Sequence, residues 1–229
     1  MIDYLVSPTL ISGMGQHVFK YTHVFENSSF LQLNEIDKIQ ENSTAMIYAL
    51  PIPEWLDAIP LLKKKCKHVI CMTVCETETV HPSYARLINM FDTIAVPSVF
   101  CLEVFSRTFP ETKFKVIHAH VPVPKMLIPK ENRFGIPQAK YIFYHIGNVM
   151  DPRKNVVGIL QAFNELQLPD CLLVLKATCL QNVQVDTPNV YVINGLRPQK
   201  IIDHFHAICD CYVSFSNSEG IGMGAVEAA

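Results

Sequence analysis

Apolar residues fall in short runs that alternate with segments of helical periodicity. In the first half of the chain, the runs predict strands at residues 2–6, 30–33, 45–50, 68–74, 93–96 and 115–121. Tyr84, Leu87, Ile88 and Phe91 recur at the spacing of one helix face, and Ser98 stands where a side chain caps a further helix. Strands that alternate with helices predict parallel sheets covered on both faces.

A proline-rich segment interrupts this alternation between residues 122 and 137. The pattern then resumes, with strands expected at residues 141–146, 171–175, 190–193 and 211–215 and helices around 156–163 and 198–208. We therefore expect an α/β protein with two Rossmann-like domains. Residues 1–121 form the first, 122–137 the linker, and 138–229 the second, which shows about four strands and is expected to be incomplete.

Composition excludes several classes of protein. Of 229 residues, 49% are apolar and 17% charged, which is wrong for a disordered chain. The net charge of -2 gives no general attraction to nucleic acid. No secretory signal or membrane-length apolar run is present, and most of the eight cysteines adjoin apolar runs, as reduced thiols do. These features predict a cytoplasmic protein. A lysine cluster at residues 63–67 leaves weak peripheral membrane contact open.

Polar residues and glycines just after strands are the candidates for binding, because ligands of such folds lie at the carboxyl ends of the strands. Gly13 and Gly15 follow the first strand and free main-chain amides for an anion. Val18 stands where a dinucleotide fingerprint has its third glycine, but Glu35 could serve as the ribose-binding acid. An NAD-dependent oxidoreductase therefore stays open, as does a glycine turn without a ligand.

Glu76 follows the fourth predicted strand closely, is expected to face a cleft and is a candidate catalytic residue. With Glu78 it makes a Glu-x-Glu pair that could hold a metal. Glu78 lies two residues further on and is expected in an ordinary polar loop. No Asp-x-Asp metal motif occurs. The pairs His204/His206 and Cys209/Cys211 have zinc-ligand residue types, but their spacing fits no common zinc pattern. We expect no metal and no cofactor.

Gly147 ends the first strand of the second half, and Arg153 and Lys154 follow at the predicted start of a helix. Cations there oppose the helix dipole, and a bound phosphate would remove that conflict. The alternative is that both cations are solvated and Asp151 offsets them. The electrostatic argument favours an anion site.

The last motif runs from Ser216 to Glu227 and carries three alternating glycines after a strand. Glycines free the main-chain amides to face an anion, and a carboxylate can accept two sugar hydroxyls. A glycine loop flanked by Glu219 and Glu227 therefore suits a phosphorylated sugar better than it suits a surface turn.

These residues resemble a known family. The chain is similar to retaining nucleotide-sugar glycosyltransferases of the two-Rossmann-domain (GT-B) type, close to glycosyltransferase family 4. Its most specific phrase is Glu219-x7-Glu227 with Gly220 and Gly222. The matching phrases cover most of the chain in the family's order, at residues 75–77, 89–92, 96–98, 116–118, 151–163 and 218–228.

The resemblance implies roles for the matching residues. Glu219 is expected to contact the donor sugar and Glu227 the nucleotide ribose. Gly220, Ile221 and Gly222 would offer amides to the sugar and diphosphate. The resemblance further implies that cations neutralise the diphosphate and that a glycine of the opposite domain lies beneath the phosphates, with Lys154, Arg153 and Gly15 at those positions. The implied reaction is metal-independent sugar transfer, of hexosyl or mannosyl type, from a nucleoside diphosphate sugar to an unknown glycan, lipid or protein acceptor.

Two departures from the family qualify this expectation. Asn148 stands where family members often carry an arginine, so one diphosphate cation is missing unless Arg153 substitutes. The sequence stops two residues after Glu227, where a family member continues. A remnant that binds a nucleotide sugar without turnover is therefore the second alternative.

Overall fold

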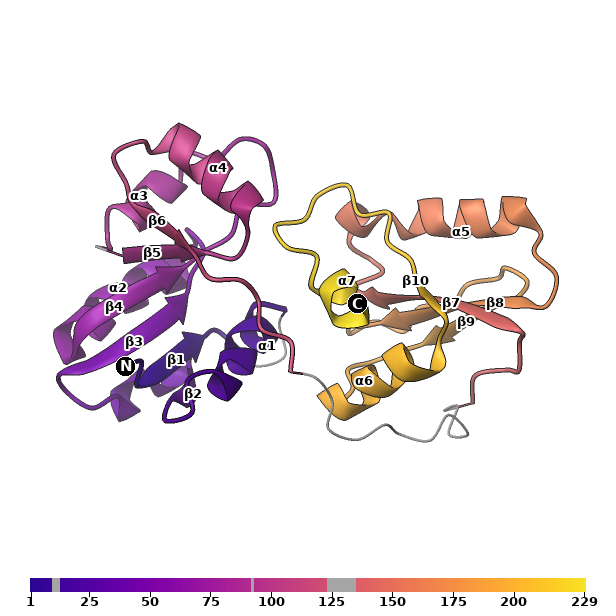
Figure 1. Ribbon diagram of the computed structural model, residues 1–229, viewed down its shortest axis with the longest axis horizontal. Helices are drawn as coiled ribbons and strands as arrows, with labels where there is room; N and C mark the ends of the chain where they lie inside the picture. Colours follow the sequence, from indigo (N-terminus) through magenta and orange to yellow (C-terminus); the bar gives the residue numbers. More distant parts are fainter. Residues whose placement is uncertain (10–12, 92, 123–134) are drawn as a thin grey trace. The chain divides into compact units, whose positions relative to one another are not determined.

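The computed structural model describes residues 1–9, 13–91, 93–122 and 135–229. Ser12, Asp92 and most of the expected linker, residues 123–134, lie outside the described residues. The chain divides into two compact units (Figure 1). The first comprises Met1–Pro122 and Glu219–Ile221, and the second comprises Val123–Ser218 and Gly222–Ala229.

The first unit contains a parallel sheet of six strands in the order β2-β1-β3-β4-β5-β6 among its described residues. The strands are β1 (Tyr4–Ser7), β2 (Ser29–Gln32), β3 (Ser43–Tyr48), β4 (Cys66–Met72), β5 (Thr93–Val96) and β6 (Phe114–Val116). The helices are α1 (Gly13–Lys20), α2 (Pro53–Lys65), α3 (Tyr84–Ile88) and α4 (Val99–Thr108), with 3-10 turns η1 (Tyr21–His23) and η2 (Leu33–Lys38).

Both faces of this sheet are buried, because alternate residues of its central strands enter two different cores. Ile47 packs with Trp55 of α2 and Phe105 of α4. Met46, one residue earlier on β3, packs with Val18 of α1 on the opposite face. Near-continuous apolar runs are what a doubly covered parallel strand requires, and the six residues of β3 are all buried.

The second unit contains a parallel sheet of four strands in the order β10-β7-β8-β9 among its described residues. The strands are β7 (Tyr141–Gly147), β8 (Cys171–Ala177), β9 (Val190–Ile193) and β10 (Cys211–Tyr212). The helices are α5 (Val156–Leu166), α6 (Gln199–Ile208) and α7 (Met223–Ala228), and a 3-10 turn, η3 (Pro152–Lys154), precedes α5.

This second sheet is also covered on both faces. Leu173 and Leu175 of β8 pack against Ile159 of α5. Val174, between them, packs with Phe205 of α6 on the other face. The predicted α/β class with parallel sheets in two separate units is thereby confirmed.

Strand ends were the least accurate part of the sequence reading. β6 ends at Val116, whereas the apolar run predicted a strand to residue 121, and β10 has two residues where five were expected. One further main-chain bond continues each pairing, from Ile117 to Val96 and from Val213 to Tyr144 (2.9 and 2.8 Å). An apolar run predicts burial, but it does not say how long a neighbouring strand accompanies it.

The predicted helix cap at Ser98 and the lysine cluster at residues 63–67 both lie in the described part of the chain. Ser98 caps α4 as expected, because its hydroxyl accepts a hydrogen bond from the amide of Cys101 (3.2 Å). Lys63 and Lys65, in the lysine cluster, donate to the main-chain carbonyls of Met90 and Asp37 (2.9 and 2.7 Å). These two lysines therefore fasten the end of α2 to neighbouring loops. In the described part of the chain, no helix is both long and apolar enough to cross a membrane.

Candidate functional site

The carboxyl edge of the second sheet is formed by the adjacent ends of β10, β7 and β8. Gly147, the last residue of β7, lies in register with Ala177 of β8, and Tyr144 lies in register with Tyr212 of β10. A Cβ atom on Gly147 would come within 3.0 Å of the His145 imidazole, so the glycine allows the strand end to pass this ring closely. The loops that leave this edge carry most of the predicted donor-binding residues.

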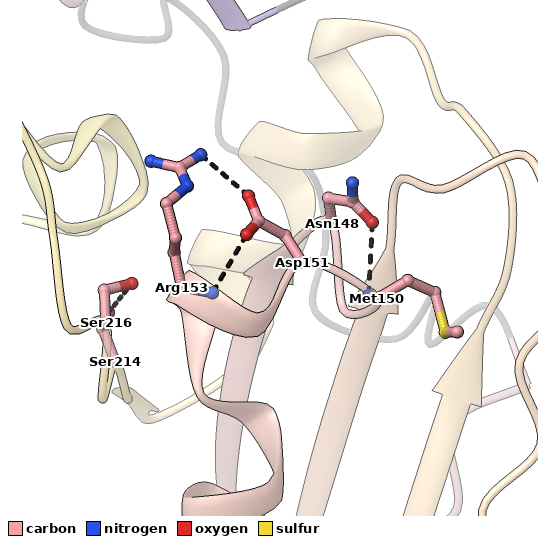
Figure 2. Close-up of polar contacts among 6 residues, drawn as sticks. All are labelled: Asn148, Met150, Asp151, Arg153, Ser214 and Ser216. Atoms are coloured by element: carbon pink, nitrogen blue, oxygen red, sulfur yellow. Dashed lines mark hydrogen bonds and ion pairs between the residues drawn. The ribbon is translucent and has the colours of Figure 1, made fainter. Parts of the chain in front are cut away.

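The loop after β7 folds around the carboxylate of Asp151. This carboxylate accepts the main-chain N–H of Arg153 (3.0 Å) and pairs with the Arg153 guanidinium (2.7 Å), as Figure 2 shows. Burial alone would raise the pKa of Asp151, but these hydrogen bonds and the charges of Arg153 and Lys154 outweigh it and lower the pKa. Asn148, at the position of the expected arginine, accepts the amide of Met150 with its side-chain oxygen (3.2 Å).

The two cations, predicted at the start of a helix, lie in the 3-10 turn that precedes α5. Arg153 and Lys154 belong to η3, and Asn155 separates that turn from α5. Asn155 adopts a left-handed conformation (φ 47°) and caps α5 by accepting the amide of Gly158 (3.2 Å). The two cations therefore lie just before the amino-terminal end of α5, and the anion site stays a prediction. Asp151 offsets Arg153, as the alternative reading proposed.

The loop after β10 is tied to this turn. The main-chain N–H of Asn217 donates to the carbonyl of Arg153 (2.8 Å). The hydroxyl of Ser214 donates to that of Ser216 (3.3 Å), on the side of Arg153 away from Asn148 in Figure 2. Residues more than sixty positions apart in the sequence thus form one surface at the carboxyl edge.

Helix α7 follows this loop and begins at a glycine whose conformation requires it. Gly222 has φ 63°, the left-handed region that side chains disfavour, and it directly precedes α7. A Cβ atom on Gly224 would lie 2.2 Å from the Tyr212 hydroxyl, so its role in the structure is close packing. This packing does not test the predicted role of the three glycines in anion binding, which stays a prediction.

Glu227 lies on α7 and faces His206 of α6. The Oε2 atom of Glu227 is 3.7 Å from Nε2 of His206, and both side chains are largely shielded from solvent. The other ring nitrogen of His206 lies 2.8 Å from the hydroxyl of Tyr144 on β7. Glu227, predicted to hold the ribose, is thus part of a polar cluster inside the second unit.

Lys176 is a buried cation at the same edge that the sequence reading missed. It is 1% exposed and donates to the carbonyls of Ala177 (2.8 Å) and Gly195. Burial, and then repulsion from Arg197, lowers the pKa of Lys176 to about 8. The signal that could have revealed it is a single lysine at the end of an otherwise apolar strand.

In the first unit, Gly13 is the first residue of α1 and Gly15 the third. A Cβ atom on Gly13 would meet no neighbouring atom, so packing does not require this glycine. Glu35 caps η2, where its carboxylate accepts the amide of Gln32 (2.9 Å) and pairs with Lys38 (2.6 Å). The carboxylate that could have served a dinucleotide ribose is engaged locally.

The main-chain N–H of Thr73 donates to the carbonyl of Ala95 and so extends the pairing of β4 by one residue. Glu76 lies three residues after Thr73, in a loop, and is half-buried. Ser7 is the last residue of β1 and lies at the same edge of this sheet. Its hydroxyl is buried and has no hydrogen-bond partner among the described residues. Buried hydroxyls of this kind call for an explanation such as a water or a ligand atom. The sequence reading missed Ser7.

The structure brings together some of the predicted donor-binding residues. Gly147, Arg153 and Lys154 adjoin the start of the glycine motif in the second unit. Gly222 and Glu227 belong to that unit as well, whereas the intervening Glu219, Gly220 and Ile221 are grouped with the first unit, as are Gly13, Gly15 and Glu76. Among the described residues, no group of three or more His, Cys, Asp and Glu side chains could hold a metal ion.

Comparison with known proteins identifies the fold. No family model matches the sequence, and no curated protein matches it. Among solved structures, WaaG, a glycosyltransferase involved in lipopolysaccharide biosynthesis, is similar over 100% of this chain and 78% of its own, with a TM-score of 0.61 and 10% identity. The GtfA/B complex is similar over 86% of this chain, which spans 42% of that chain, with a TM-score of 0.52 and 13% identity. With its two parallel α/β units, the chain has the GT-B fold.

Proposed function

We propose that this chain belongs to a glycosyltransferase that moves a sugar from a nucleoside diphosphate sugar to an acceptor. The GT-B fold supports this, and WaaG, which shares the fold, is described as a glycosyltransferase. We further propose the finer assignment that the resemblance implies: a retaining, metal-independent, cytoplasmic enzyme of family 4 that transfers a hexosyl or mannosyl group. The second unit is the proposed donor-binding domain.

The observation that carries the proposal is the hydrogen bond from Asn217 N–H to the carbonyl of Arg153. It joins the loop that holds two cations to the loop that leads into the glycine motif, at the carboxyl edge of a parallel sheet. Ligands of doubly wound α/β folds bind at this edge. A diphosphate lying along the edge could meet Arg153, Lys154 and main-chain amides at once.

The chemistry requires stabilisation of a leaving diphosphate. Cleavage of the bond between the anomeric carbon and the phosphate oxygen leaves its electron pair on that oxygen. In our proposal, the positive charges of Arg153 and Lys154 and the amides near Gly222 stabilise this charge. The acceptor hydroxyl forms the new glycosidic bond and gives its proton to the leaving phosphate, which accounts for retention without a separate base.

The remaining residues take roles around this step. Glu227 would hold the ribose and Glu219 the donor sugar, with Gly220 and Ile221 offering amides. The first unit would serve the acceptor, whose identity as glycan, lipid or protein stays undefined. We propose Glu219 and Glu76 as the catalytic residues, neither of them acting as the base. Gly13 and Gly15, at the start of the helix that follows β1, are proposed donor-binding residues.

Two alternatives make different predictions. An oxidoreductase would bind NAD through Gly13, Gly15 and Glu35, but the Glu35 carboxylate is engaged with Gln32 and Lys38. A binding-only protein would take up a nucleotide sugar and leave it intact.

A thermal-shift and calorimetry screen against UDP-, GDP- and ADP-sugars and NAD separates the three. We expect one nucleotide sugar to raise the melting temperature, NAD to leave it unchanged, and the bound sugar to be released as a transfer or hydrolysis product. Stabilisation by NAD alone would overturn the proposal in favour of the oxidoreductase. Tight nucleotide-sugar binding without any product would favour the binding-only protein.

A further inference from the structure

Three polar side chains from three different elements form a chain inside the second unit. Tyr144 of β7, His206 of α6 and Glu227 of α7 lie in sequence, with Tyr144 Oη 2.8 Å from His206 Nδ1 and His206 Nε2 3.7 Å from Glu227 Oε2. Tyr144 is 3% exposed, and the side chains of His206 and Glu227 are 11% and 15% exposed. Solvent therefore screens this cluster weakly.

The contacts of His206 favour one of its two neutral tautomers. Burial is the main cause that raises the pKa of Tyr144, so its hydroxyl stays protonated and can donate. If Tyr144 donates to Nδ1, the single proton of a neutral imidazole must sit on Nε2. The opposite tautomer would put the Nε2 lone pair against the Glu227 carboxylate, which is repulsive. The favourable arrangement is Tyr144 O–H to Nδ1, with Nε2–H facing Glu227.

The packing around the cluster holds this arrangement in place. The ring of Tyr212 stands nearly perpendicular to that of Tyr144 (centroids 5.3 Å apart, 77°) and lies 6.5 Å from the His206 ring. Gly224 lets α7 lie against the Tyr212 hydroxyl, which sets the position of the helix that carries Glu227. The imidazole therefore has little freedom to turn away from the carboxylate.

We propose that Tyr144 and His206 are positioning residues that orient the Glu227 carboxylate for the two hydroxyls of the nucleotide ribose. This rests on the proposed function, in which Glu227 holds the ribose. One carboxylate oxygen is attracted by Nε2–H, and the carboxylate is thereby held with its remaining acceptor sites turned to the ligand. His206 acts through Glu227 and touches no ligand atom.

The tautomer is tested in the ligand-free protein. Heteronuclear NMR of the imidazole nitrogens should show a proton on Nε2 of His206 and an accepting Nδ1. In Tyr144→Phe, which removes one oxygen atom, this signature should be lost. Tyr141→Phe is the matched control, because Tyr141 is an exposed tyrosine on the same strand. A proton on Nδ1 of His206 in the wild-type protein would overturn the proposed arrangement of Tyr144, His206 and Glu227.

The positioning role is tested by ribose discrimination. The probes are the nucleoside diphosphate that binds best among UDP, GDP and ADP, and its dideoxyribose counterpart. His206→Gln keeps an N–H near the position of Nε2, whereas His206→Asn keeps one only near Nδ1. We expect the wild-type preference for ribose to fall about three- to tenfold in His206→Asn and Tyr144→Phe, with His206→Gln largely restoring it. Affinity for the dideoxy probe should not change in any of these variants.

The outcomes distinguish the positioning role of His206 and Tyr144 from the proposed function on which it rests. An equal loss of affinity for both probes in His206→Asn would indicate a purely structural histidine and overturn the positioning role. A preference for ribose that vanishes in Glu227→Gln but is unaffected at His206 and Tyr144 would overturn it too, while leaving the ribose-binding carboxylate intact. If no nucleoside diphosphate binds although the NMR signature is present, the proposed function fails and the positioning role fails with it.

Discussion

The imidazole of His17 lies 3.2 Å from the hydroxyl of Tyr21, which itself donates to the carbonyls of Ile117 and His118 (3.0 and 2.8 Å). This chain of contacts fastens α1 to the segment that follows β6, nearly one hundred residues later. Because the Tyr21 hydroxyl donates its proton to these carbonyls, the His17 imidazole is the donor in its contact with Tyr21. Burial, and then the charge of Lys20, lowers the pKa of His17 to about 4 from 6.5.

Acid should destabilise the first unit through His17. Between pH 6.5 and about 4, the unfolded chain binds a proton at this residue and the folded chain does not, so the free energy of unfolding falls as the pH falls. The loss is at most about 3 kcal/mol. Urea titrations across this range should show it in the wild type and less of it in His17→Gln. His68→Gln, at an exposed histidine, is the control and should follow the wild type.

Lys176 should make the second unit more stable in alkali. Its pKa is about 8 in the folded chain against 10.5 when unperturbed, so the unfolded chain binds more protons between these values and stability rises with pH. The gain is at most about 3 kcal/mol. Melting curves of Lys176→Met should lack this component, while Lys140→Met, at an exposed lysine, should retain it. Identical pH dependence in wild type and Lys176→Met would contradict the assignment.

Gly224→Ala should destabilise the packing of α7, because the added methyl group would meet the Tyr212 hydroxyl at 2.2 Å. We expect a cost of about 1–3 kcal/mol, the usual range for overpacking. Tyr212→Phe removes the hydroxyl and should recover part of this cost in the double variant. A double-mutant cycle by denaturant unfolding measures the coupling, and strictly additive effects would argue against this contact.

Lys154→Ala should weaken nucleoside diphosphate binding by about 1.5–3 kcal/mol, the range for a hydrogen bond to a charged group. Calorimetry with UDP, GDP and ADP measures this. Lys140→Ala, which removes an exposed lysine of the same unit, should leave affinity unchanged. Equal affinities in Lys154→Ala and the wild type would remove Lys154 from the donor site.

Glu219 and Glu227, the two acids of the last motif, should affect different steps: sugar transfer and nucleotide binding. Glu219→Gln should leave affinity for free nucleoside diphosphate nearly intact and reduce sugar turnover, because its proposed contact is the sugar. Glu227→Gln should weaken the binding of free nucleoside diphosphate. Calorimetry and a product assay on both variants decide this, and equal losses of nucleotide affinity would contradict the division.

The fold could be predicted from the sequence because burial on both faces of a parallel sheet leaves a strong pattern. The six buried residues of β3 and the helical stripe of α5 are examples. Strand ends could not be predicted, since they depend on how far a neighbour extends. For β10, the ladder stops two residues into the apolar run.

The candidate site was predictable in residue type but not in detail. Gly147, Arg153 and Lys154 could be named as candidates because they follow a predicted strand, and the structure places them beside the start of the glycine motif. The sequence could not show that Asn155, by adopting a left-handed conformation, would separate the cations from α5. It also could not show that Tyr144 and His206, sixty-two residues apart, would meet beside Glu227.

The ion pair between Asp151 and Arg153 gives the turn after β7 its own counterion. With Lys154, the turn carries a net charge of one rather than two, so dissolved salt has less to attract there. An anion that reaches Arg153 meets a guanidinium already paired with Asp151, so it gains less there than it would at an unpaired cation. The turn therefore favours ligands with several negative oxygens over single-charged ions, and its net positive charge should make its affinity for them fall as the ionic strength rises.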